Sequence, residues 1–314
     1  GISTTTGAIA VTGIGATVGL ALAGGELSTE SGHFDLRGRG TGAGSDGLVI
    51  GQGVSIATNG GGIELSGEGG SGAGVSLEAG SSVDAGNSLV VVRAGNDGSS
   101  DALRIAGTIA SGMAVNLRPG GVDANGGLTE RTADEILIGG GSAGFALSGA
   151  ELALIDAPEL IIGSNLHAGA IRVLGATSRS GDLTLQNDGG SGGIDIQAAL
   201  DVGTGTLALS SGGDITQSSG GAITAHSLLA RAGGSVLLAD AGNNVAATTL
   251  AGSAGGDFEY EDVDALAIGS VSGVTSRPDA RNRSIVAVRA STSCSVSIRP
   301  GWHRRTAGPP HIRI

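Results

Sequence analysis

The chain has 314 residues, of which 62 are glycine and 39% are hydrophobic, and its formal net charge is −12 at pH 7. Collagen is excluded because glycine has no three-residue period and only six prolines occur. Intrinsic disorder is also excluded, because aliphatic residues are abundant and regularly spaced, whereas the 2% of aromatic residues predicts a narrow core without a broad aromatic pocket.

No apolar run is long enough for a membrane-spanning helix. Gly1 is not followed by a basic segment and then an apolar one, the pattern of a signal peptide. We therefore interpret the chain as a fragment of a longer protein whose signal peptide is not visible.

The first stretch with chemically reactive side chains is 32–40, GHFDLRGRG. Two apolar residues alternate there with four polar ones: Phe34 and Leu36 with His33, Asp35, Arg37 and Arg39. A row of His, Asp and Arg is a candidate for acid–base catalysis. The alternation itself predicts a strand with one solvated face on which opposite charges pair, and we favour that interpretation.

Residues 41–49, TGAGSDGLV, match all but the first position of the calcium-binding nonapeptide GGxGxDxUx, with Asp46 as the ligand. Such sites need the motif in tandem, because calcium lies between successive turns. The next nine residues place Ser55 at the ligand position, and residues 189–197 carry Asp195 one position late. We therefore predict no metal ligand here.

Short alternating runs dominate the sequence from 1 to 276. Apolar side chains occupy every second position, which is the period of a strand with one buried face. The segments between the runs are rich in the turn formers Gly, Ser, Asn and Asp. The clearest runs are 53–56, 62–65, 74–77, 103–107, 181–185, 193–196, 205–209 and 234–238.

Such strands are too short to bury a face alone and too many for one sandwich, which favours stacked coils. We predict an all-β fold, a right-handed parallel β-helix (β-solenoid) with about 20 residues per coil, in which about 13 coils form a rod on the order of 60 Å long. Glycine should supply the corners. Six side chains should point inward: Ile194, Ile196, Leu207, Leu209, Val236 and Leu238.

Residues 133–156, ADEILIGGGSAGFALSGAELALID, have the pattern of a dinucleotide-binding fingerprint. Its motif residues are Gly139, Gly141 and Gly144, with the acidic Asp156 and Glu159 downstream. In a glycine-rich chain this spacing arises by chance, and the amphipathic helices of a Rossmann domain are missing. We expect one helical turn near residues 150–154, a strand at 159–163 and no dinucleotide cofactor.

Three segments carry a more specific likeness: 145–176 (FALSGAELALIDAPELIIGSNLHAGAIRVLGA), 213–245 (GDITQSSGGAITAHSLLARAGGSVLLADAGNNV) and 264–274 (DALAIGSVSGV). They resemble filamentous haemagglutinin-like exoproteins, the two-partner-secreted adhesins of Gram-negative bacteria. The first half of the chain resembles these proteins only in the general character of its sequence. The resemblance implies a right-handed parallel β-helix, export through an outer-membrane pore partner, and a role in adhesion or biofilm formation. The shared motifs are structural, so no functional residue is carried over.

We therefore expect a non-catalytic rod segment of a secreted or surface-displayed adhesin, contacting host-cell or bacterial-surface receptors or glycans. No catalytic, cofactor-binding or metal-binding residue and no nucleic-acid partner is expected; His167 and His226 lack metal-ligand spacing. The alternative is a β-helix polysaccharide lyase or hydrolase, whose sites combine carboxylates with aromatic side chains. Only residues 257–264, DFEYEDVD, offer that combination, with Asp257, Glu259 and Glu261 as candidates, and we favour an edge loop there.

Residues 277–314 differ from residues 1–276, the predicted rod. They hold eight of the 17 basic residues, all arginine, with one acid and the only cysteine. A nucleic-acid or membrane arm is one interpretation of this basic tail. Because the chain has no lysine, we favour an atypical tail that is disordered or translated in a shifted frame. Nothing in the sequence positions a base beside the cysteine; the residues concerned are Cys294, His303 and His311.

Overall fold

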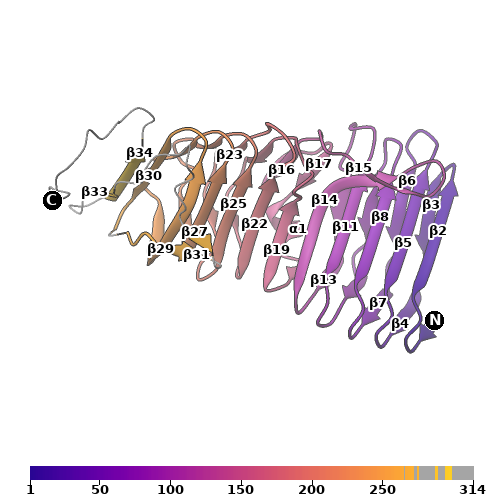
Figure 1. The fold of residues 1–314 in the computed structure, drawn as a ribbon. Helices are drawn as coiled ribbons and strands as arrows, with labels where there is room; N and C mark the ends of the chain where they lie inside the picture. Colours follow the sequence, from indigo (N-terminus) through magenta and orange to yellow (C-terminus); the bar gives the residue numbers. More distant parts are fainter. Residues whose placement is uncertain (265, 272–273, 276–286, 289–293, 299–314) are drawn as a thin grey trace.

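The structure, a computed structural model, describes residues 1–264, 266–271, 274–275, 287–288 and 294–298. Its regular secondary structure is nearly all β-strand, with almost no helix, and the chain winds into a parallel β-solenoid of about ten turns (Figure 1). The all-β, β-helical class predicted from the sequence is confirmed. Cys294 lies within a described strand, whereas His303 and His311 lie outside the described residues.

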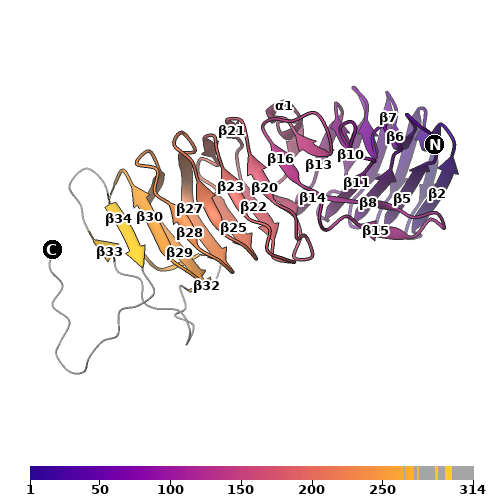
Figure 2. The ribbon, with the colours of Figure 1, turned by 90° about the horizontal axis from the view of Figure 1, so that it is seen from above.

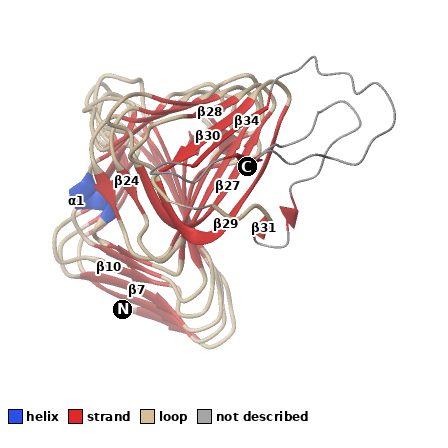
Figure 3. Cartoon of the chain, turned by 90° about the vertical axis from the view of Figure 1, so that its left-hand side faces the viewer, coloured by secondary structure: helices blue, strands red, loops and turns tan. Residues whose placement is uncertain are grey.

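Each regular turn contributes one strand to each of three faces, which Figure 3 shows along the rod. Face A consists of β1 (Ile2–Thr4), β4 (Gly25–Thr29), β7 (Val54–Thr58), β10 (Ser82–Asp84), β13 (Thr108–Ala110) and β18 (Ile155–Asp156), and is continued by β21 (Thr177–Ser178) and β24 (Leu200–Asp201). Face B consists of β2 (Ile9–Gly15), β5 (Phe34–Gly40), β8 (Ile63–Glu68), β11 (Val90–Gly95), β14 (Ala114–Val122), β19 (Glu159–Gly163), β22 (Asp182–Asn187), β25 (Thr206–Ser211), β27 (Ile223–Ala232) and β29 (Asn244–Ala254).

Face C completes the turns. Its strands, in spatial order, are β3 (Val18–Leu22), β6 (Asp46–Ile50), β9 (Val75–Leu77), β12 (Leu103–Ile105), β17 (Phe145–Leu147), β16 (Ile136–Ile138), β20 (Ile171–Val173), β23 (Ile194–Ile196), β26 (Ile215–Gln217), β28 (Val236–Leu238) and β30 (Phe258–Asp262). The long strands β27 and β29 begin on face A and bend onto face B, because their first residues and their later residues pair with different neighbours.

The strand register shows that most turns are longer than predicted. On face A, Ser55 and Ser82 are register partners in successive turns and lie 27 residues apart in the sequence. On face C, in contrast, the register partners Asp195 and Thr216 are only 21 residues apart. The expected turn of about 20 residues therefore describes the C-terminal turns alone. On face A the N-terminal strands, such as β4 and β7, are longer than the later β21 and β24, and the rod has about ten turns instead of about 13.

The core is a stack of aliphatic side chains in register. Each such side chain that leaves water stabilises the fold by about 1.5–3 kcal/mol. The six residues predicted to point inward are all fully buried, which confirms that part of the prediction. The inner row of face B runs through Phe34, Ile63, Val90, Val115, Leu160, Leu183, Leu207 and Leu228, none more than 2% exposed.

One insertion interrupts the regular winding. Asn116 on β14 and its register partner Ile161 on β19 are 45 residues apart. The chain between them forms β15 (Leu128–Glu130), β16, β17, the short helix α1 (Gly149–Leu152) and the face A strand β18. Strand β16 lies between β17 and β20, so face C gains one strand that faces A and B lack. The rod changes direction at about this level (Figure 2).

The C-terminal elements pair in antiparallel fashion. Strands β31 (Ser270–Val271) and β32 (Val274–Thr275) form a small hairpin. Strand β34 (Cys294–Ile298) pairs with β30 on one side and with β33 (Ala287–Val288) on the other. Strands β33 and β34 lie in residues 277–314, the basic tail, for which the sequence predicted no strand.

Candidate functional site

The most distinctive site is a hairpin that lies lengthwise on face B. Strand β14 pairs with β11 as far as Pro119, which lacks the N–H that a sheet ladder needs. Beyond it, residues 120–122 turn away and pair in antiparallel fashion with β15. Residues 119–131, here called the strap, run back over β8 and β5 towards β2. The N-terminal half of face B is therefore covered by its own chain.

Glycines let the strap lie close to the strands beneath. A Cβ atom on Gly121 would collide with the Glu68 carboxylate, and one on Gly120 would crowd Arg93 and the Thr129 carbonyl. The tip of the strap is a turn closed by Asp123, whose Oδ1 accepts hydrogen bonds from the N–H groups of Asn125 (2.7 Å) and Gly127 (2.8 Å). The backbone N–H groups of Gly127 and Asn125 hold the pKa of Asp123 below its ordinary value.

Glu130 neutralises two arginines that stand side by side. Arg93 on β11 and Arg118 on β14 are register partners, an arrangement of like charges that is unfavourable by itself. The Glu130 carboxylate lies 3.2 Å from Arg93 Nε and 3.7 Å from Arg118 Nη2. Arg93 also pairs with Glu64 on β8. Burial, and next the charge of Arg118, lower the pKa of Arg93.

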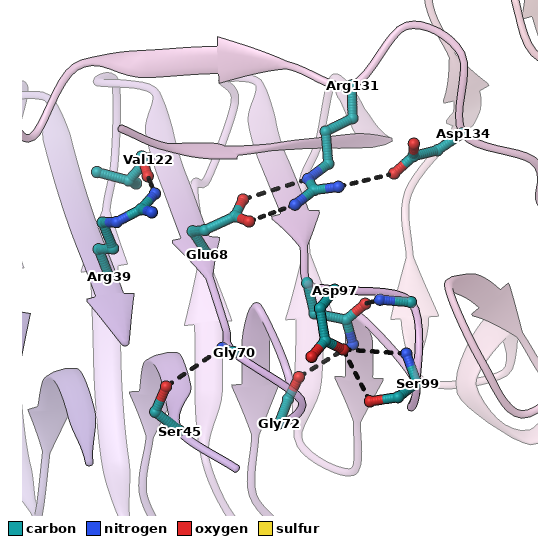
Figure 4. A network of polar contacts seen from close by, with 12 residues as sticks. Arg39, Ser45, Glu68, Gly70, Gly72, Asp97, Ser99, Val122, Arg131 and Asp134 are labelled. Atoms are coloured by element: carbon teal, nitrogen blue, oxygen red, sulfur yellow. Dashed lines mark hydrogen bonds and ion pairs between the residues drawn. The ribbon is translucent and has the colours of Figure 1, made fainter. Parts of the chain in front are cut away.

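Three further arginines hold the strap on face B, and Figure 4 shows two of them, Arg39 and Arg131. Arg131 pairs with Glu68 and, at 3.4 Å, with Asp134. The hydrogen bond to Glu68 is the main cause that raises the pKa of Arg131. The other two arginines donate to strap carbonyls: Arg39 Nη1 to Val122 at 2.5 Å, and Arg37 Nη1 to Gly126 at 3.1 Å. Five of the nine arginines in residues 1–276 therefore serve this one site.

The row of His, Asp and Arg proposed at 32–40 lies beneath the strap. Arg37 and Asp35 pair through two contacts, Nε–Oδ1 at 2.7 Å and Nη2–Oδ2 at 2.5 Å, which confirms the predicted charge pairing. The prediction of a solvated face is wrong in part, because the strap covers Arg37 and Arg39. His33 is exposed at the start of the strand. The strap was missed, although Pro-Gly-Gly directly after the alternating run AVNLR signals a strand that leaves its sheet.

The calcium candidate Asp46 has a structural contact. Its Oδ1 accepts a hydrogen bond from the Ala73 N–H of the next turn at 2.7 Å. The other position weighed, Asp195, accepts from Gln197 and Thr216. Among the described residues, no three His, Cys, Asp or Glu side chains gather closely enough to hold a metal ion.

The glycines of the GxGxxG motif form a solenoid corner. Gly139, Gly141 and Gly144 all have positive φ, and they connect two strands of face C that pair with each other, β16 and β17. The helical turn that follows is α1, begun by Ser148 and Glu151 as a capping box. It is followed by β19 at the predicted position. This geometry is that of stacked turns, not of a Rossmann unit.

Most of the acidic–aromatic cluster at 257–264 forms strand β30 (Phe258–Asp262), so the predicted edge loop is wrong. Phe258 and Tyr260 point into the core and are at most 2% exposed. The Tyr260 hydroxyl donates to Asp262 Oδ2 at 2.6 Å, and Asp262 is itself fully buried. Asp257, Glu259 and Glu261 remain partly exposed beside them. The aromatic rings are therefore not a platform on which a sugar can stack.

The two isolated histidines occupy different environments. His226 is exposed on β27. His167 is 2% exposed, in the corner that follows β19, and its Nε2 has no hydrogen-bond partner. Burial lowers the pKa of His167, although Asp134 and Glu130 oppose that effect.

A polar hollow of about 500 Å³ lies on face A across the first three turns. Ser and Thr hydroxyls make up most of its lining, together with two carboxylates and one amide. The lining residues are Ser3, Thr4, Thr5, Glu26, Ser28, Thr29, Glu30, Ala57, Thr58 and Asn59. Hydroxyl, amide and carboxylate groups are suited to hydrogen-bonding a polyhydroxylated ligand.

Comparison with known protein families, curated proteins and solved structures found no match to this chain. Within the described residues, no helix has the length and apolar character needed to cross a membrane.

Proposed function

We propose that residues 1–276 are a non-catalytic rod segment of a secreted, surface-displayed bacterial adhesin of the filamentous haemagglutinin type. The observation that carries the proposal is the architecture, a stack of about ten parallel turns around an aliphatic interior. Such a stack extends by adding turns, each of which contacts only its neighbours, and so presents a long surface. Adhesion to host cells, bacterial surfaces or glycans, or biofilm formation, is the role this rod would serve.

The composition supports export before folding. Residues 1–276 contain no cysteine, so no disulfide can form before the chain has crossed a membrane pore. Their nine arginines against 28 acids give a formal charge of −19, which opposes association of unfolded chains. An outer-membrane pore would be the export partner, and the turns would then fold one upon another outside the cell.

Direct binding is the test of the adhesin proposal. We expect the purified chain to bind cells or immobilised neutral glycans and to cleave no polysaccharide. Glu30→Gln with Asn59→Ala should weaken glycan binding, because both side chains line the hollow on face A. Glu78→Gln, an exposed site outside the hollow, is the matched control and should leave binding unchanged.

The alternative, a carbohydrate-active enzyme, predicts polysaccharide cleavage in the same assay. Polysaccharide turnover that is abolished by Asp257→Asn, Glu259→Gln or Glu261→Gln would replace the adhesin proposal with a carbohydrate-active enzyme. Absence of both turnover and binding to every cell and glycan tested would also contradict an adhesive role for this segment.

A further inference from the structure

The hollow on face A is built from one kind of corner that repeats in three successive turns. Each corner has the sequence Thr-x-x-Gly, at 4–7, 29–32 and 58–61. In each corner the Thr hydroxyl accepts a hydrogen bond from the Gly N–H, at 3.1, 2.9 and 3.0 Å. The threonines are register partners, so the same corner is stacked three times along the rod. Two of them, Thr29 and Thr58, are buried and line the floor of the hollow.

Two rows of side chains flank these threonines. One row consists of the residues directly before the threonines and the other of the residues directly after them: Ser3, Ser28 and Ala57, and Thr5, Glu30 and Asn59. The first row is in strand register. The second row follows it from turn to turn, since the Asn59 N–H donates to the Glu30 carbonyl at 3.2 Å. Because adjacent strands lie about 4.8 Å apart, the hollow is a groove along the rod axis that presents a similar set of polar groups at each turn.

The charges of the groove oppose an anionic ligand. Its lining contains two carboxylates, Glu26 and Glu30, and no cationic side chain. Both carboxylates are exposed. They would repel a polysaccharide that carries carboxylates or sulfates, and the formal charge of −19 on residues 1–276 adds to that repulsion. Sugar hydroxyls, in contrast, can donate hydrogen bonds to both carboxylates. The groove therefore favours an uncharged ligand that is rich in hydroxyl groups.

We propose that the groove binds an extended, neutral, β-1,4-linked polysaccharide that lies parallel to the rod axis with one sugar unit per turn. This inference rests on the proposed adhesive function and narrows it to one class of ligand. The units of such a chain repeat at close to the strand separation of about 4.8 Å, so successive sugars meet equivalent corners. Three turns then accommodate three sugars. A helical chain, such as an α-1,4-linked glucan, leaves a groove of this direction after one or two units.

Calorimetric titration of the full chain with β-1,4-linked gluco-oligosaccharides of one to six units tests the fit. We expect the affinity to rise about tenfold with each sugar up to three, because each sugar adds hydrogen bonds at one more corner, and to level off beyond three. Two comparison ligands of equal length isolate shape and charge: α-1,4-linked gluco-oligosaccharides and β-1,4-linked oligomannuronate. Both should bind at least tenfold more weakly than the neutral β-1,4-linked chain.

Two alanines in one row of face A supply a matched pair of variants. Ala57 and Ala110 are both aligned with Asp84, one on each side of it, and only Ala57 lines the hollow. Ala57→Leu places a branched apolar side chain in the groove and should weaken binding of the trisaccharide at least tenfold. Ala110→Leu makes the same change outside the groove and should leave binding as it is. Circular dichroism and the denaturant midpoint show whether both variants are folded.

A charge variant tests the groove independently of steric blocking. Glu26→Gln/Glu30→Gln changes two exposed side chains, so the fold should be retained. The variant should bind the trisaccharide more weakly, because each lost carboxylate is a stronger hydrogen-bond acceptor than the amide that replaces it. It should also bind oligomannuronate more tightly than the unchanged chain does, because the repulsion is removed.

The proposed ligand is overturned if affinity does not depend on chain length, if the two leucine variants bind alike, or if oligomannuronate binds as tightly as the neutral chain. A protein that fails these tests but still binds cells or other glycans keeps its adhesive function and loses only this ligand. A protein that binds no cell and no glycan overturns both proposals.

Discussion

Glu130 decides whether two arginines can occupy neighbouring strands. Its carboxylate is the shared counter-charge of Arg93 and Arg118, which the strand register places side by side. We expect Glu130→Gln to lower the free energy of unfolding by about 1–2 kcal/mol, since a charge-assisted hydrogen bond is lost and the two arginines then repel. Denaturant unfolding followed by circular dichroism measures the change.

A second substitution tests whether the loss of stability comes from repulsion between the two arginines. Removing one of the two like charges should relieve the repulsion, so Glu130→Gln/Arg118→Gln should be less destabilised than the sum of the single variants. Strictly additive effects in this double-mutant cycle would show that Glu130 does not mediate between the two arginines.

Gly139 combines two constraints that Gly203 and Gly175 carry singly. Its φ is 76°, and a Cβ there would strike the Gly175 carbonyl of a neighbouring turn. Gly203 has φ 54° with open space around it, whereas Gly175 is crowded by Gly139 without a positive φ. We expect Gly203→Ala to cost about 1 kcal/mol and Gly139→Ala to cost about 2–4 kcal/mol. Equal costs in thermal or chemical denaturation would contradict this account.

At the level of single elements, the alternation of apolar and polar residues was sufficient to predict a strand that belongs to a regular turn. The runs at 181–185, 193–196 and 205–209 correspond to β22, β23 and β25, because their inward side chains are aliphatic and their corners are rich in glycine. One helical turn near residues 150–154 was also predicted, and helix α1 lies there. A capping box stabilises its start: Glu151 accepts the Ser148 N–H at 2.8 Å while Ser148 Oγ accepts the Glu151 N–H at 3.2 Å.

The strap was not predicted because its partners are distant in sequence. Arg39 and the Val122 carbonyl are 83 residues apart, and Arg37 and the Gly126 carbonyl are 89 residues apart. The spacing of apolar residues within a short segment gives no information on contacts between residues so far apart in the sequence. Strand β30 was missed for a different reason: its alternating Phe258, Tyr260 and Asp262 point inward, but the acids between them suggested a solvated loop. A buried aspartate at an inward position is compatible with a strand only because Tyr260 and the Val245 N–H hydrogen-bond to it.

For the whole molecule, the inserted strand β16 has a mechanical consequence. Adjacent strands lie about 4.8 Å apart, so one additional strand lengthens face C by about that amount relative to faces A and B. A rod in which one side is locally longer must curve away from that side. The change of direction near this level in Figure 2 agrees with that expectation.

Excising residues 120–138 tests whether the insertion bends the rod. The deletion removes most of the strap together with β15 and β16. It brings Val115 and its partner Leu160 almost as near in sequence as Val90 and Val115, the partners that an ordinary turn separates. Strand β17 already follows β12 on face C, through the Asp101–Gly144 bridge and the Ala102 N–H bond to the Gly144 carbonyl at 2.7 Å. The shortened chain can therefore continue as a regular turn, with Gly139–Gly144 as its corner.

We expect this shortened chain to fold with an unchanged β-sheet circular dichroism spectrum and to give a straighter rod in electron micrographs or small-angle scattering. The physical reason is that faces A, B and C then contribute equal numbers of strands at this level, so no side of the rod is longer than the others. A deletion that leaves the rod equally bent would show that the curvature comes from the twist of the turns themselves. Loss of the fold would show that the strap, and not the stacking of turns, holds the two halves of the solenoid together.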